Sequence, residues 1–138
     1  MNSKKTVIIG LAWFTISFPP VLIKTVADDA IPKKGMIKVT IFYPNAEGKT
    51  FDMEYYYTKH MPMVANLLGD SLKLYKIDKG LTGRTPDEAA PYLAIGYLYF
   101  DDRSCFQNSL GPNSEKIRGD LQNYTNIQPI VQVSEVIH

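Results

Sequence analysis

The sequence predicts an α+β domain whose strands and helices follow one another in the order β-α-β-β-α-β. Apolar and polar residues alternate with the period of a strand in residues 36–44. Helical spacing of apolar residues replaces this alternation in residues 51–68 and returns in residues 101–124. Two strand-like segments lie between the helical regions, and a third ends the chain.

The first strand, "MIKVTIFYP", places Ile37, Val39 and Ile41 on one face and is ended by Pro44. The next residues, "NAEGKT", are typical of a turn, with Gly48 as its hinge. This turn leads the chain back toward the start of the first helix.

The first helix is predicted to begin at Phe51, with Thr50 as its N-cap. Proline has no backbone N–H and interrupts a helix, so Pro62 predicts a kink near His60. A second helical segment then runs over residues 62–68. The histidine is therefore expected at a break in the helix.

The remaining strands are predicted over residues 71–81, 92–100 and 127–137, with a polar loop over 82–91. The segment "YLAIGYLYF" is apolar on both faces, which is typical of a strand in the middle of a sheet that is covered twice. Pro129 indicates that the last strand lies at an edge or carries a bulge, because proline cannot donate to a ladder.

The second helical region is predicted as two pieces, "DDRSCFQNSLG" and "PNSEKIRGDLQNY". A polar side chain that can accept hydrogen bonds from free backbone N–H groups stands at the start of each piece. The candidate caps are Asp101 or Asp102 for the first piece and Asn113 or Ser114 for the second.

This order of elements predicts the ferredoxin-like split βαβ fold, with a four-stranded antiparallel sheet. Both helices would lie on one face of the sheet and leave the other face bare. That bare face would carry aromatic and aliphatic side chains from residues 92–100. Because a large exposed apolar patch is rare, we expect a second sheet to cover it, so the sequence predicts a homodimer in which the sheets pair as a dimeric α/β barrel.

The first residues are typical of a secretory signal peptide. A basic start is followed by the apolar run "VIIGLAWFTISF" and then by small residues before a cleavage site after Ala27. The sequence therefore divides into a signal peptide, 1–27, a linker, 28–35, and the domain, 36–138. This organisation predicts export to the periplasm or the medium.

A retained membrane anchor is the alternative to cleavage. Pro19 and Pro20 interrupt the apolar stretch, and Lys24 closes it. We therefore expect no stable membrane span after signal cleavage.

Charge and cysteine content limit the function classes. The net charge is +1, and loss of residues 1–27 removes three lysines and no acid, which leaves a weakly acidic domain. Such a domain lacks the basic surface that nucleic acid requires, so no nucleic-acid partner is expected.

The single cysteine, Cys105, is interpreted as a small buried side chain rather than a nucleophile. With one interior histidine, His60, and no cysteine pair, the sequence predicts no metal site.

The domain resembles the EthD family, named from ethyl tert-butyl ether degradation, in the dimeric α/β-barrel superfamily. The resemblance covers residues 36–137, and its most specific part is an aromatic-rich helix that runs into His-x-Pro. The residues that carry it are Phe51, Tyr55, Tyr56, His60 and Pro62, with Leu74 and Tyr75 after the helix. Members are often labelled reductases, but no motif in this sequence supports that label.

The resemblance implies a ligand pocket between the first helix and the sheet, with His60 facing it. Imidazole exchanges protons near neutral pH, so the sequence suggests general acid/base chemistry on a small oxygenated, largely apolar molecule. His60 would be the base, with Tyr56 or Tyr57 on the neighbouring helical turn as the orienting phenol. The residues predicted to bind the substrate are Tyr55, Met63, Tyr75, Tyr97 and Tyr99.

Three alternatives remain open at this stage. His60 could simply bond a backbone carbonyl freed by Pro62, with the tyrosines in the core. The protein could also be an exported dimer that binds a small ligand without catalysis, because it has few polar side chains that could catalyse a reaction. Haem binding, known in the superfamily, is disfavoured because no cluster of basic residues stands near His60, so no cofactor is expected.

Overall fold

The computed structural model describes residues 32–138. The predicted signal peptide, 1–27, and the first part of the predicted linker, 28–35, lie outside the described residues. The described chain forms one antiparallel sheet in the order β2-β3-β1-β4. Its strands are β1 (Ile37–Pro44), β2 (Leu72–Lys79), β3 (Tyr92–Phe100) and β4 (Ile130–Glu135).

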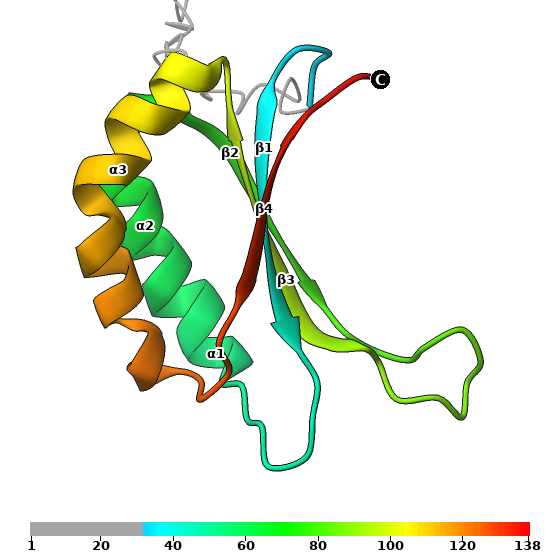
Figure 1. Cartoon of the computed structure of the whole chain (residues 1–138). Helices are drawn as coiled ribbons and strands as arrows, with labels where there is room; N and C mark the ends of the chain where they lie inside the picture. Colours follow the sequence, from blue (N-terminus) through cyan, green and yellow to red (C-terminus); the bar gives the residue numbers. More distant parts are fainter. Residues whose placement is uncertain (1–31) are drawn as a thin grey trace, which may run out of the picture.

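A single layer of helices covers one face of this sheet (Figure 1). The helix α2 (Met61–Leu68) and the longer α3 (Arg103–Gly119) lie side by side on that face, which we call the helix face. No helix of the described residues covers the opposite face, which we call the outer face. The predicted α+β, ferredoxin-like fold is therefore confirmed.

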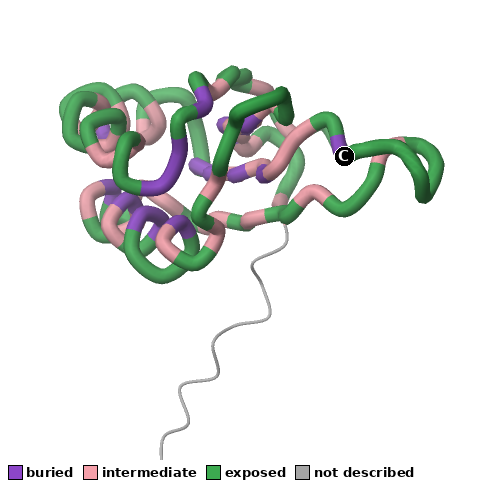
Figure 2. Tube along the Cα trace, turned by 90° about the horizontal axis from the view of Figure 1, so that it is seen from below, coloured by how far each residue is buried: buried purple, intermediate pink, exposed green. Residues whose placement is uncertain are grey.

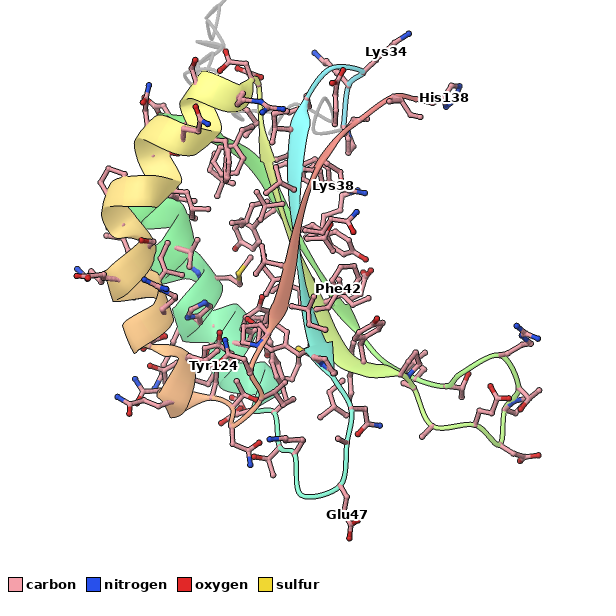
Figure 3. All side chains as sticks on the ribbon, in the orientation of Figure 1. Lys34, Lys38, Phe42, Glu47, Tyr124 and His138 are labelled. Atoms are coloured by element: carbon pink, nitrogen blue, oxygen red, sulfur yellow. The ribbon has the colours of Figure 1, made fainter. Side chains whose placement is uncertain are left out.

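The register between β1 and β3 decides which side chains lie under the helices. Val39 pairs with Leu98, and Ile41 pairs with Gly96, so these residues share the helix face. Figure 2 shows buried segments concentrated between the helices and the sheet. Side chains one residue out of step, such as Lys38 and Phe42, point away from the helices (Figure 3).

The first helical region begins later than predicted. The helix α1 (Met53–Tyr55) is capped by Asp52, whose side chain accepts a hydrogen bond of 3.0 Å from the backbone N–H of Tyr55. Thr50 is therefore not the cap, and Phe51 instead forms an isolated bridge with Thr125. Asp52 is the better cap because its carboxylate reaches the free backbone N–H groups of the first turn.

The predicted irregularity near His60 is present, but it is a π-helical turn, η1 (Tyr56–His60), rather than a break. The backbone N–H of Met61 reaches back to the carbonyl of Tyr56, a wider spacing than in an α-helix. Pro62 then stands in the first turn of α2, where its missing N–H costs little. The wide turn and the continuing helix leave the His60 ring buried, at 4% exposure.

The prediction of two separate pieces for the second helical region is wrong. The single helix α3 continues through Pro112 and is capped by Asp102, which accepts a 2.8 Å hydrogen bond from the N–H of Cys105. The helix tolerates the proline because residues 108 and 112 are both exposed, so water can reach the freed carbonyl. Asn113 is not a cap. Its side-chain amide donates to the carbonyl of Ser109, one turn earlier.

β3 has the predicted bounds, whereas β1, β2 and β4 are shorter than predicted. Pro129 immediately precedes β4, which is an edge strand, and the polar loop 82–91 projects from the end of the sheet (Figure 1). Within residues 32–138, no helix is long and apolar enough to cross a bilayer.

Candidate active site

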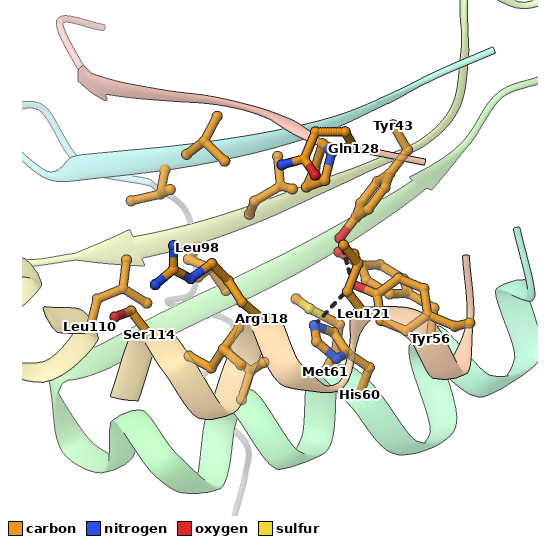
Figure 4. A pocket seen from close by; sticks show the side chains of 17 residues that line it. Tyr43, Tyr56, His60, Met61, Leu98, Leu110, Ser114, Arg118, Leu121 and Gln128 are labelled. Carbon is orange, nitrogen blue, oxygen red and sulfur yellow. Dashed lines mark hydrogen bonds between the residues drawn. The ribbon is translucent and has the colours of Figure 1, made fainter. Parts of the chain in front are cut away.

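A cavity of about 500 Å³ lies between α2, α3 and the helix face of the sheet (Figure 4). Its size falls in the range of small-molecule sites. Most of its lining is aliphatic, from Val39, Ile41, Met61, Val64, Leu98, Leu110, Ile117, Leu121, Pro129 and Val131. Its polar side chains are Tyr43, Tyr56, His60, Ser114, Arg118, Tyr124 and Gln128.

The side chain of His60 lines the cavity and is held by the carboxylate of Asp120, which does not line it. The ring nitrogen Nδ1 lies 2.8 Å from Oδ2 of Asp120, with the His60 side chain 5% exposed and the Asp120 side chain 15% exposed. An ionised carboxylate can only accept a hydrogen bond, so Nδ1 carries the proton and donates it. The other ring nitrogen, Nε2, is then unprotonated and carries the lone pair that a general base requires.

The surroundings keep His60 neutral and Asp120 ionised near pH 7. Burial lowers the pKa of His60 below its usual 6.5, although the hydrogen bond and charge of Asp120 act in the opposite direction. Burial raises the pKa of Asp120, but hydrogen bonds from His60, Asn123 and Tyr55 outweigh it and bring that pKa below 3.8. The pair is therefore a neutral imidazole beside a carboxylate.

Two tyrosine hydroxyls extend this pair toward the sheet. The hydroxyl of Tyr124 lies 3.4 Å from Nε2 of His60, and the hydroxyl of Tyr43 lies 2.8 Å from that of Tyr124 (Figure 4). Since Nε2 is unprotonated, Tyr124 donates to it and accepts from Tyr43. Burial raises the pKa of both phenols well above 10, so they remain proton donors at physiological pH.

The ring of Tyr56 packs against the imidazole of His60. Its ring stacks on the His60 ring, with 5.3 Å between centroids and 15° between planes. Its hydroxyl reaches the sheet at Gly96, where any Cβ atom would collide with it. The glycine in β3 therefore makes the space that lets Tyr56 lie flat under His60.

Asp120 is positioned by the end of α3 and by two further donors. It is the C-cap residue of α3 and leads into the short helix η3 (Leu121–Asn123). Its Oδ1 atom accepts hydrogen bonds from the hydroxyl of Tyr55, at 2.9 Å, and from the amide of Asn123, at 2.8 Å. With His60 on Oδ2, the carboxylate is held on both oxygens, which restricts its rotation.

The structure brings two of the three predicted catalytic residues together. His60 and Tyr56 are in contact at the cavity, whereas Tyr57 is 53% exposed and does not line it. The prediction for Tyr57 fails because the turn that places Tyr56 and His60 inward carries the intervening residues outward. The alternative in which His60 bonds a carbonyl freed by Pro62 is also wrong, since Nδ1 bonds Asp120.

The predicted substrate-binding residues lie outside the cavity lining. Tyr55 supports Asp120, and Met63 and Tyr75 are half-buried against the core. Tyr97 and Tyr99 are on the outer face, because the helix face takes the even-numbered residues of β3. Tyr97 donates a 2.8 Å hydrogen bond to Asp78 there, and burial raises the pKa of Tyr97 to about 12.

The residues that sequence reasoning missed come from other segments of the chain. Asp120 and Tyr124 lie in the stretch after α3, 60 and 64 residues from His60. The sequence predicts Tyr43 and Met61 only as parts of a strand and a helix. The one available signal was the alternation in β1, which places Tyr43 on the same face as Val39.

The described residues offer no group of three or more histidine, cysteine, aspartate or glutamate side chains that could hold a metal ion. The sole cysteine, Cys105, is half-buried, and burial and the neighbouring Asp102 raise the pKa of its thiol. The titratable side chains that line the cavity are those of His60, Arg118 and the tyrosines Tyr43, Tyr56 and Tyr124.

The fold and the site together define the class of protein. It is a ferredoxin-like domain with a histidine–carboxylate pair beside an apolar cavity. The EthD domain model matches residues 47–127, which is more than half of the chain. An EthD-like protein from Ralstonia eutropha JMP134 is 38% identical, with a TM-score of 0.72, over 77% of this chain and 96% of that one. The chain belongs to the EthD family.

A second solved structure supports the fold at a greater distance. It is an EthD family protein from Bacillus halodurans C-125, 18% identical with a TM-score of 0.54, over 74% of this chain and 99% of that one. A comparison with curated proteins found none that matches. The predicted family is confirmed by the EthD domain model and by the 38% identical relative.

Proposed function

We propose that the chain is a proton-transfer enzyme in which His60 acts as general base on a small oxygenated, largely apolar molecule. The observation that carries this proposal is the 2.8 Å contact between Asp120 and Nδ1 of His60 in the wall of an apolar cavity. The carboxylate fixes the tautomer, and the cavity keeps the imidazole neutral, so Nε2 is ready to accept a proton.

The proposed step begins when Nε2 takes a proton from a carbon next to a carbonyl group. The electron pair of that C–H bond moves into the carbonyl, and the resulting enolate oxygen accepts a hydrogen bond from the Tyr124 hydroxyl. The 3.4 Å contact between Tyr124 and His60 is long for a hydrogen bond, so the substrate oxygen can replace it at low cost.

The imidazolium then returns the proton. If a C=C double bond is conjugated with the enolate, return of the proton to the far carbon of that bond completes an isomerisation. If the substrate carries a β-hydroxyl group, transfer of the proton to that group, which leaves as water, completes a dehydration. Both outcomes balance without an oxidant or a reductant.

Deuterium exchange tests this chemistry without knowledge of the natural substrate. The α-protons of 1-indanone and 2-tetralone in D₂O, followed by NMR, should exchange faster with the wild-type protein than in buffer. His60→Gln should abolish the acceleration, and Asp120→Asn should reduce it about tenfold or more. Tyr57→Phe, at an exposed position of the same helical turn, should leave it unchanged. Acceleration that persists in His60→Gln would refute the proposal.

A binding protein without catalysis is the second candidate, and the aliphatic lining of the cavity favours it. Native mass spectrometry of protein purified from its own host distinguishes the two. A binding protein should carry its ligand through purification, and the exchange assay should show no acceleration.

We also propose that two copies pair through their outer faces. Phe42, Leu93 and Ile95 are half-buried on this face, and no helix of the described residues covers it. The edge strand β4 adds Ile130, which pairs with Phe42 and is 55% exposed. A second sheet would remove these apolar surfaces from water.

Export remains a proposal drawn from the first residues. The intact mass of protein from the native host tests it, and a mass that corresponds to an N-terminus at residue 28 would support it. A chain that keeps residues 1–27 would refute cleavage.

A further inference from the structure

We infer that Arg118 selects an anionic molecule for the cavity: an apolar body that lies against the aliphatic walls and carries a carboxylate or similar anion toward α3. This inference rests on the proposed function, because it names the chemical class of the molecule on which His60 would act. It adds a charge requirement that the acid/base chemistry alone does not contain.

The guanidinium of Arg118 lines the cavity from the last turn of α3 (Figure 4). Among the described residues it makes no ion pair, and its guanidinium donates no hydrogen bond to another side chain or carbonyl. A planar group with five N–H donors is suited to a carboxylate, which it can bind through two parallel hydrogen bonds.

The residues around Arg118 are a second observation that favours an anion. A polar hollow of about 420 Å³ adjoins the cavity and shares Arg118, Leu121 and Gln128 with it. Lys49 lines the same hollow, and no aspartate or glutamate lines either space among the described residues. The nearby Asp120 does not compete, because its oxygens already accept from His60, Tyr55 and Asn123.

A role for Arg118 in helix stability alone does not account for its place. Basic side chains in the last turn of a helix are favoured by the helix dipole, and Lys116 meets that condition equally well. Lys116 and Arg118 are both exposed, but Lys116 lines neither space, whereas Arg118 lines both. Lys116 is therefore a matched control for charge and position on α3.

The test uses two ligands of nearly the same shape, 1-naphthoate and its neutral counterpart 1-naphthamide, with dissociation constants measured by calorimetry on the full chain. Wild-type protein should bind naphthoate about tenfold more tightly at low salt, and high salt should reduce this preference. Arg118→Gln should bring the two affinities together, Arg118→Lys should keep part of the preference, and Lys116→Gln should keep all of it.

Equal affinities of the two ligands for the wild-type protein would overturn the inference and leave the proposed function standing. Loss of the preference in Lys116→Gln as large as in Arg118→Gln would also overturn it, because general charge would then explain the effect. Failure of both ligands to bind would overturn the inference together with the cavity as a ligand site.

Discussion

The carboxylate of Asp120 lies 2.8 Å from Nδ1 of His60, although 60 residues separate them in the sequence. The contact joins the π-helical turn η1 to the end of α3 and fixes which ring nitrogen is free. Each member of the pair makes a further contact. The ring of Tyr56 stacks on the imidazole, and the hydroxyl of Tyr55 donates a hydrogen bond to the carboxylate. The pair is therefore part of a connected group of side chains that lines the cavity through His60 and Tyr56.

Asp120→Asn should lower the pKa of His60 further, because the variant removes the charge that favours the imidazolium. It should also destabilise the fold by about 1–3 kcal/mol, since hydrogen bonds to a charged, largely buried acceptor are weakened. Urea unfolding and NMR titration measure the two effects. Asp101→Asn, whose partner Lys73 is 3.4 Å away and exposed, should change stability by less than about 1 kcal/mol. Equal losses in both variants would contradict the structural role of Asp120.

Gly96→Ala should destabilise the protein by about 1–3 kcal/mol, because the added Cβ atom overlaps the hydroxyl of Tyr56. The double variant with Tyr56→Phe should recover most of this loss, since the overlapping oxygen is then absent. Thermal unfolding measures both. Gly111→Ala is the control: its Cβ meets nothing within 4 Å in α3, so helix propensity should stabilise that variant by up to about 1 kcal/mol. Full stability of Gly96→Ala would show that the contact is not tight.

Stability should fall in two steps as the pH is lowered. The pKa of folded His60 lies below the usual 6.5, so the unfolded chain takes up the proton first. The stability from neutral His60 is therefore complete above pH 6.5 and is lost between 6.5 and the lower pKa of the folded state. The pKa of Asp120 is also lowered, so its contribution is present above pH 3.8 and is lost as the pH falls through its folded value.

Urea unfolding at a series of pH values tests this prediction. His60→Gln should remove the first step, while His138→Gln, at the exposed end of the chain, should keep it. A wild-type stability that stays constant from pH 7.5 down to about 5 would contradict the lowered pKa of His60.

The outer face should mediate a homodimer. Light scattering should give the mass of two chains at micromolar concentration, and Phe42→Asp should give the mass of one, because a charge would be buried between the sheets. Tyr57→Asp, on the exposed side of the helical layer, should remain dimeric. A monomeric wild-type protein would rule out the sheet-to-sheet pairing.

The sequence was sufficient for the fold because local signals specify its elements. Alternation in β1, the change to helical spacing after Thr50 and the doubly apolar β3 each depend on neighbouring residues. Helix ends were less predictable: Asp52 rather than Thr50 became the cap, and α3 continued through Pro112. These differences depend on solvent access and side-chain reach, which a linear pattern does not contain.

The candidate site was only half predictable for the same reason. His60 and Tyr56 are one helical turn apart, so their proximity follows from the sequence. Asp120 and Tyr124 reach His60 only through the packing of α3 and η3 over the sheet. Tyr97 and Tyr99 do not line the cavity because they lie one residue out of step with Leu98, and a shift of one residue along a strand exchanges the two faces.

The protonation state of His60 is the measurement that tests the central claim most directly. The chain has two histidines, so nitrogen NMR of ¹⁵N-labelled protein, with His138→Ala to assign the signals, can resolve the His60 ring. We predict that near pH 7 the proton is on Nδ1, that Nε2 is unprotonated, and that the pKa lies below 6.5. A proton on Nε2, or an imidazolium at neutral pH, would contradict the account, because His60 would then have no lone pair to offer a substrate.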